Sequence, residues 1–221
     1  MLDFYGTLVE EDTEIIRRIA QRIAAASPRA PSPGEVGVLW GRRFSALCAE
    51  SHGARFETQR ALERSSLCEV LARFESPLDP EDLSAELFAY WAAPRPINGA
   101  AEFLRGLRVP VCIVSNIDSA DFEAAVSSLG WSFDRVVTSE CCRAYKPRAE
   151  LFRAAVEVLG CAPADALHVG DSFDSDVRGA AALGISAAWI NPRKKPTPED
   201  PAVRPSYVVT SVSELASALE K

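Results

Sequence analysis

Short apolar runs alternate with amphipathic stretches over the second half of the chain. The apolar runs have the length of β-strands and cover residues 109–115, 135–139, 166–170 and 185–190. Helical patterns lie near residues 100–107, 120–129, 149–159 and 175–183. This alternation predicts an α/β fold with a Rossmann-like parallel sheet. Ligands bind at the carboxyl ends of the strands in such sheets, so the polar residues after these runs are candidate site residues.

The stretch from residue 13 to residue 94 has a different pattern, with no convincing strand. Four helical patterns fit residues 13–25, 34–51, 56–74 and 80–92, with proline-bearing breaks at 28–33 and 77–80. We therefore predict a helical cap domain over residues 13–94, inserted into a core domain formed by residues 1–12 and 95–221. A proline-rich loop over residues 192–205 is expected to precede a last strand near 207–210 and a C-terminal helix.

Composition and charge narrow the classes of partner. The 221 residues are 48% hydrophobic and 25% charged, which favours a packed core over disorder. The net charge of −7 disfavours nucleic acid and anionic membranes, and neither a membrane span nor a leader is expected. Six cysteines without a CxxC pair are typical of free thiols in the cytoplasm. We expect a small anionic substrate and a monomer or homodimer.

Three polar clusters follow the first predicted strands. Asp3 precedes a glycine turn and Thr7, a pattern that can present a carboxylate nucleophile among backbone amides. Ser115 and Asn116 end the second strand, and Lys146 stands just before a predicted helix. Each cluster has an ordinary structural explanation when taken alone, because such residues are common in turns and on surfaces.

The fourth cluster is acidic and follows the run at 166–170. Asp171, Asp174 and Asp176 lie within six residues of one another. Carboxylates this close repel and need a counter-charge, for which a hard divalent cation with oxygen ligands is suited. The alternative is that these side chains only cap the following helix.

Taken in chain order, the four clusters read DxxGT, SN, KP and GDxxxxD. This order resembles the haloacid dehalogenase-like hydrolase superfamily, and the resemblance covers the whole chain. It implies a Rossmann-like core, a four-helix cap of the first type (C1) and an Mg²⁺-dependent hydrolase.

The resemblance also implies roles at the reacting centre. Asp3 would form the covalent aspartyl intermediate, and Lys146 would pair with Asp3 and the transferring group. Mg²⁺ would be held by the carboxylates of Asp3 and Asp171 and by the Tyr5 carbonyl. Asp176 would bind it directly or through water. A cation and an ammonium would together offset the repulsion between a carboxylate nucleophile and an anionic substrate.

Substrate-binding roles follow from the same resemblance and from the charge of the cap. The Thr7 hydroxyl, Ser115 and the Asn116 backbone would bind phosphoryl oxygens. Arg42 or Arg43 in the cap is the candidate for reading a second anionic group, although a solvated helix face would explain both arginines as well.

Tyr5 departs from the pattern of the phosphatases in this superfamily. A second aspartate usually stands there as general acid and base, and a phenol with a pKa near 10 is a poor replacement at neutral pH. The first motif with Tyr5 and the helical cap instead resemble the L-2-haloacid dehalogenase branch. Asp171 argues against that branch, and so do Gly41, Phe152 and Phe173, which replace residues specific to it.

Three functions therefore remain open. The first is a phosphatase of a small phosphorylated metabolite, with Tyr5 as a catalytic candidate in the place of the acid. The second is a 2-haloacid dehalogenase-type hydrolase, and the third is a protein that binds a ligand with little turnover. Only Met1 and Leu2 precede Asp3, so either further residues precede Met1 in the protein or the central strand is short.

Overall fold

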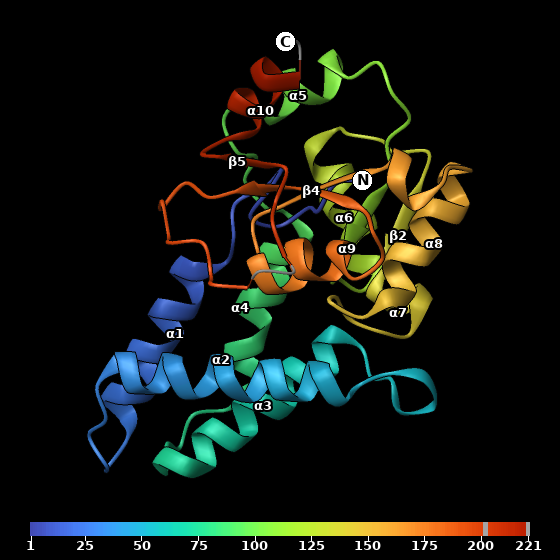
Figure 1. The fold of residues 1–221 in the computed structure, drawn as a ribbon. Coiled ribbons are helices and arrows are strands. Elements are labelled where there is room, and N and C mark those ends of the chain that lie inside the picture. The colour runs from blue at the N-terminus through green and yellow to red at the C-terminus, as the bar shows by residue number, and fades with distance from the viewer. Residues whose placement is uncertain (201–202, 220–221) are drawn as a thin grey trace. The chain divides into compact units, whose positions relative to one another are not determined.

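The computed structural model describes residues 1–200 and 203–219 (Figure 1). Part of the predicted loop at 192–205 lies outside them. The chain forms two compact units. Unit 1 comprises Met1–Glu10, Arg95–Asn116 and Trp131–Lys221, and unit 2 comprises Glu11–Pro94 and Ile117–Gly130. Unit 2 thus includes a helix after Ile117 that the sequence analysis placed in the core.

Unit 1 contains the parallel sheet. Strand β1 pairs with β2, and β4 lies between β3 and β5, every pair being parallel. The prediction of an α/β fold with a parallel sheet is confirmed. The strands are β1 (Ile113–Ser115), β2 (Val136–Thr138), β3 (Leu167–Gly170), β4 (Ser186–Ile190) and β5 (Tyr207–Val209).

Residue Leu2 joins the two parts of the sheet. It forms parallel bridges to Ile113 of β1 and to Val169 of β3. On the β3 side the Asp3 amide donates to the Val169 carbonyl at 2.9 Å, and on the β1 side the Leu2 amide donates to the Cys112 carbonyl at 2.9 Å. The central strand is therefore a pair of bridges, and Asp3 stands directly at its end.

Two predicted elements differ from the structure. The run at 109–115 forms a strand only from Ile113, and Val109 is 65% exposed. A strand needs a partner on its edge, and Pro110 has no N–H to donate. The helix predicted over 175–183 is a π-helix, η3 (Phe173–Arg178), followed by the short α9 (Gly179–Ala181).

The remaining helices of unit 1 pack around this sheet. Helix α8 packs against β1 and β2, and α10 lies beside α5 (Figure 1). Side chains such as Leu151 and Phe152 of α8 are fully buried in the core of the unit. The elements are α5 (Ala100–Gly106), α7 (Ser139–Cys142), α8 (Ala149–Leu159), η2 (Pro163–Asp165) and α10 (Val212–Leu219).

Unit 2 is helical. Helices form at all four predicted patterns, and α2 packs between α1 and α3. Ser32 and Glu35 form a reciprocal capping box that begins α2, as expected for an S-x-x-E sequence. None of the helices within the described residues is both long and apolar enough to cross a membrane. The elements are α1 (Thr13–Ala26), α2 (Pro33–Glu50), η1 (Gly53–Arg55), α3 (Gln59–Phe74), α4 (Pro80–Ala92) and α6 (Ser119–Leu129).

Candidate active site

Asp3 is a buried carboxylate held at the start of a tight turn. The Thr7 hydroxyl donates to Asp3 Oδ2 at 3.2 Å, and the Thr7 amide donates to the Phe4 carbonyl at 3.4 Å. Gly6 has a φ of +81°, and a Cβ there would lie 2.5 Å from Asp171 Cγ. Only glycine fits both conditions. The turn therefore brings the carboxylates of Asp3 and Asp171 to the same place.

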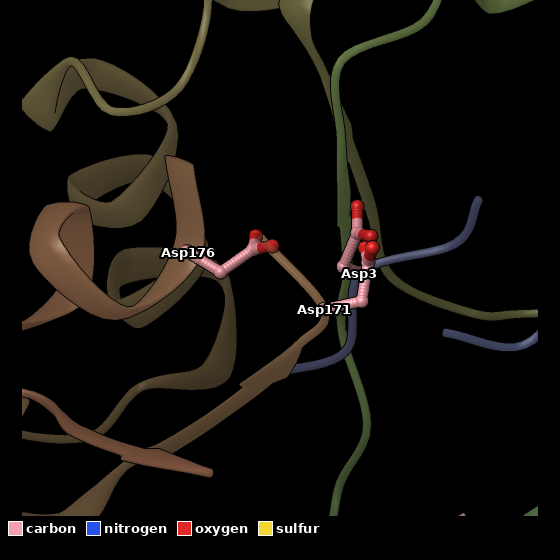
Figure 2. A group of neighbouring side chains, drawn as sticks. All are labelled: Asp3, Asp171 and Asp176. Carbon is pink, nitrogen blue, oxygen red and sulfur yellow. The ribbon is translucent and has the colours of Figure 1, made fainter. Parts of the chain in front are cut away.

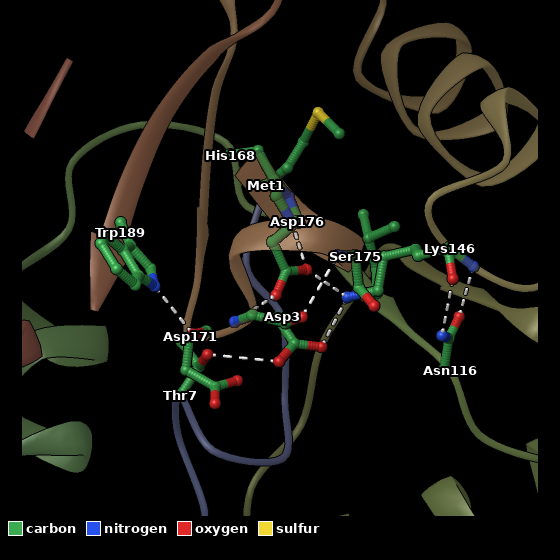
Figure 3. Close-up of polar contacts among 12 residues, drawn as sticks. Met1, Asp3, Thr7, Asn116, Lys146, His168, Asp171, Ser175, Asp176 and Trp189 are labelled. Carbon is green, nitrogen blue, oxygen red and sulfur yellow. Dashed lines mark hydrogen bonds and ion pairs between the residues drawn. The ribbon is translucent and has the colours of Figure 1, made fainter. Parts of the chain in front are cut away.

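Lys146 lies in the middle of the site with its side chain almost fully buried. Its Nζ donates to Asp3 Oδ1 at 2.7 Å, to Asp176 Oδ1 at 2.6 Å and to the Val114 carbonyl at 2.9 Å (Figure 3). Burial alone would lower the pKa of Lys146, but the carboxylates of Asp176 and Asp3 raise it above its ordinary value. The side chain is therefore a fixed cation at neutral pH.

The Asn116 side chain fixes the backbone of Lys146. Asn116 Oδ1 accepts the Lys146 amide at 2.7 Å, and Asn116 Nδ2 donates to the Lys146 carbonyl at 3.3 Å (Figure 3). The side-chain amide of Asn116 thus positions the lysine, and a phosphoryl contact by the Asn116 backbone stays a prediction. Ser115 is buried at the end of β1.

The acidic motif follows β3, and its residues Asp171 and Asp176 have different surroundings. Asp171 is half-buried, and the Trp189 indole donates to its backbone carbonyl at 2.9 Å. Asp176 is buried, and its Oδ2 accepts the Ser172 amide at 3.0 Å while its Oδ1 accepts from Lys146. A Cβ on Gly170 would lie 2.2 Å from Asp176 Cγ, so this close approach requires glycine.

His168 belongs to the same network, although no role is predicted for it from the sequence. Its Nε2 lies 2.9 Å from Asp176 Oδ1, and its ring packs edge-on against Phe152. Burial lowers the pKa of His168 to about 4, so the ring is neutral at pH 7 and Nε2–H is the donor. The alternation of side chains along a strand could have indicated this contact. His168 and Gly170 lie on the same face of β3, and Gly170 is close to Asp176.

Three carboxylates lie near one another, with Asp176 directed toward Asp3 and Asp171 in Figure 2. Ligand oxygens of Asp3, Asp171 and Asp176 all lie within 4.8 Å of one another. Burial raises the pKa of Asp3 to about 6, against the opposing effect of the Lys146 ammonium. Asp3 and Asp176 share that ammonium, and Asp171 adds a third carboxylate. A hard cation with oxygen ligands fits this donor set. Both oxygens of Asp3 and both oxygens of Asp176 also accept hydrogen bonds from the chain, so a bound cation would share these carboxylates with Lys146.

Comparison with known proteins identifies the family. The family model for haloacid dehalogenase-like hydrolases matches residues 1–184. The chain belongs to this family. The predicted superfamily is thus confirmed on a match that contains all four motifs.

Two curated relatives match a little more than half of the chain. The chain is 31% identical over 150 residues to haloacid dehalogenase-like hydrolase domain-containing protein 3 of Bos taurus, covering 62% of this chain and 58% of that protein. It is 30% identical over 131 residues to pyrimidine 5'-nucleotidase YjjG of Escherichia coli (strain K12), covering 57% of each. The chain thus spans less than two thirds of these curated relatives.

A solved structure of an L-2-haloacid dehalogenase extends the likeness over the whole fold. It covers 100% of this chain and 97% of its own, with a TM-score of 0.81 and 24% identity. At that identity the likeness concerns the fold. A haloacid dehalogenase-like core therefore carries the site, and the relatives leave the choice between phosphatase and dehalogenase open.

The other predicted site residues are Tyr5 in unit 1 and two arginines in unit 2. Tyr5 is half-buried, with its ring edge-on to Phe4 at 5.3 Å between centroids. Arg42 and Arg43 lie on α2 in unit 2, where Arg42 is exposed and Arg43 forms an ion pair with Glu69. A role for either arginine in substrate binding stays a prediction.

Proposed function

We propose that the chain is an Mg²⁺-dependent phosphatase of a small phosphorylated metabolite that uses Asp3 as nucleophile. The observation that carries the proposal is the group of Asp3, Asp171 and Asp176 around a common point. A haloacid dehalogenase that works without a metal has no need of the carboxylate of Asp171. Mg²⁺ held by Asp3 and Asp171 would supply positive charge beside the transferring phosphoryl group.

The residues of the chain account for the first chemical step. Asp3 is held by Thr7 and Lys146 on different oxygens, so its carboxylate meets the phosphorus in one orientation. The bond from Asp3 to phosphorus forms as the bond to the leaving oxygen breaks, giving an aspartyl-phosphate that water then hydrolyses. The Lys146 ammonium offsets the negative charge of the phosphoryl group.

The leaving oxygen explains the expected substrate range. An alkoxide needs a proton to leave, whereas an aryloxide or carboxylate leaves more readily without one. Tyr5 stands where an acid is expected, and a phenol donates and accepts protons poorly at neutral pH. The proposed enzyme should therefore prefer aryl and acyl phosphates to alkyl phosphates.

Replacing Tyr5 with Asp tests this reasoning. The change should raise kcat/KM for an alkyl phosphate relative to an aryl phosphate by about tenfold or more, because a positioned acid contributes roughly 10²–10⁴-fold to such steps. The ratio of the two kcat/KM values is measured in wild type, in Tyr5→Asp and in Tyr5→Phe. An unchanged ratio in Tyr5→Asp would mean that residue 5 does not reach the leaving oxygen.

Metal removal tests the role of the carboxylates. EDTA should abolish hydrolysis of p-nitrophenyl phosphate, and excess Mg²⁺ should restore it. Asp171→Asn should need a higher Mg²⁺ concentration for half-maximal rate, because one charged oxygen ligand is lost. Asp174→Asn is the matched control, since that side chain is exposed and pairs with Arg178 instead. Full activity in EDTA would refute the metal-dependent phosphatase.

A 2-haloacid dehalogenase is the second candidate, and Tyr5 favours it. Halide leaves without a proton, so the reaction through an aspartyl ester on Asp3 needs no acid at residue 5. Release of chloride from L-2-chloropropionate in EDTA would support this function over the first. If neither substrate class is turned over in an Asp3-dependent way, the third hypothesis, a ligand-binding protein with this fold, takes their place.

A further inference from the structure

Two neighbouring thiols on α7 lie side by side, away from the carboxylate site. Cys141 Sγ and Cys142 Sγ are 3.8 Å apart, with Cys141 exposed and Cys142 half-buried. The turn after β2 fixes the first thiol. Thr138 Oγ1 accepts the Cys141 amide at 3.2 Å, and Cys141 Sγ accepts the Thr138 amide at 3.2 Å. The local fold therefore positions the sulfur of Cys141, and the sulfur of Cys142 lies beside it.

The separation of the sulfurs indicates what the pair can bind. Two thiolates on one tetrahedral metal ion, each bonded at about 2.3 Å, have their sulfurs about 3.8 Å apart. A disulfide needs a separation of about 2.05 Å. The observed 3.8 Å is thus closer to the separation of two sulfurs on one shared atom than to that of a disulfide.

The number of available ligands narrows the choice of that atom. Among the residues that the structure describes, the one group of three or more His, Cys, Asp or Glu side chains at ligand distance is Asp3, Asp171 and Asp176. Cys141 and Cys142 therefore have no third side-chain ligand, whereas structural zinc takes four ligands. An atom that exchanges two of its bonds for bonds to sulfur, and keeps a third bond to its own substituent, needs only two thiols.

We propose that Cys141 and Cys142 form a bidentate thiol site for thiophilic metalloids, of which a monosubstituted trivalent arsenical is the representative ligand. An arsenoso group, R–As=O, would form two As–S bonds with the two thiols, and both thiol protons would leave with the oxygen as water. Arsenic stays trivalent, so no oxidant or reductant is required. Chelation should make binding about 10²–10⁴-fold tighter than binding to either thiol alone.

The two thiols are expected to react in a fixed order. Burial and the neighbouring Cys141 raise the pKa of Cys142 to about 12, so Cys142 is a neutral thiol at physiological pH. The exposed Cys141 meets the arsenical first, and Cys142 then closes the ring. Closure, rather than the first encounter, provides the lasting retention.

The test uses phenylarsine oxide with the full-length protein. Wild type should retain one phenylarsenic group in the presence of excess glutathione and release it to 2,3-dimercaptopropanol, as followed by intact mass. Proteolytic mapping should place the group on the peptide that contains residues 141 and 142. Mapping needs no variant, so it holds even if a substitution disturbs folding.

Serine variants supply the controls. Cys141→Ser and Cys142→Ser should each lose the group in glutathione, with apparent affinity reduced at least about 10²-fold. Cys68→Ser is the matched control, because Cys68 is also an exposed free cysteine and lies in unit 2. It should behave as wild type. Retention by Cys141→Ser, loss from wild type in glutathione, or mapping to another peptide would overturn the proposal.

Discussion

Asp3→Asn is expected to lower hydrolytic activity by about 10⁴-fold or more while the protein remains folded. The nucleophile is lost, and removing such a group from a catalytic site has effects of this order. The buried carboxylate opposes folding when ionised, because burial raises its pKa to about 6, so neutral Asn should not lower the melting temperature at pH 8. Turnover of p-nitrophenyl phosphate and the melting temperature are both measured.

The control for this variant comes from the acidic motif. The side chain of Asp174 is 81% exposed and pairs with Arg178, so Asp174→Asn removes a carboxylate without touching the site. It should keep wild-type turnover. If Asp3→Asn retained more than a few per cent of the activity, a different nucleophile would have to be sought.

Lys146→Met is expected to destabilise unit 1 as well as to abolish activity. It leaves the buried carboxylates of Asp3 and Asp176 without the ammonium that contacts both. Breaking a buried ion pair in this way costs about 3–5 kcal/mol, which corresponds to a fall in melting temperature on the order of 10 °C. Thermal unfolding at several pH values measures the effect.

The pH dependence of this loss has a definite sign. Asp176 has its pKa lowered in the folded protein: burial would raise that pKa, but the Lys146 ammonium and His168 lower it. Its contribution to stability is present above the ordinary pKa of 3.8 and is lost as the pH falls. Without Lys146 the buried carboxylates destabilise the folded protein less when they are protonated than when they are ionised. The deficit of Lys146→Met should therefore be larger at pH 8 than at pH 5.

A second lysine variant shows whether the loss of a positive charge elsewhere in the chain also lowers the melting temperature. Lys195 is exposed, and Lys195→Met should change the melting temperature by less than about 1 °C. A deficit for Lys146→Met that is the same at both pH values would show that lost packing, and not unpaired charge, explains the destabilisation.

The sequence predicted the elements of the fold better than their extents. Hydrophobic periodicity located the α/β core, because the spacing of apolar residues along the chain decides which face of a helix or strand is buried. It overestimated the strand that ends at Ser115, since residues 109–112 have the composition of a strand but do not form part of one. The short helix α7 at Ser139–Cys142 carries no periodic signal, and it depends on a cap from Thr138.

At the site, the sequence identified the groups whose motifs are contiguous. Asp3 and Lys146, which are 143 residues apart, contact each other as the family resemblance implied. His168 was not assigned a role, because its importance lies in a contact with Asp176 across η3 and not in a motif. The pairing of Cys141 with Cys142 likewise depends on side-chain direction, which adjacency in the sequence leaves undetermined.

The bridge formed by Leu2 has a consequence for how unit 1 comes apart. Among the described residues, backbone hydrogen bonds of Met1, Leu2 and Asp3 connect the β1–β2 pair with the β3–β4–β5 group. Separation of those two parts must pull the Asp3 carboxylate away from its neighbours at the same moment. A partly open state of this sheet would therefore be catalytically silent, and thermal inactivation would follow the cooperative melting of the sheet without an active intermediate.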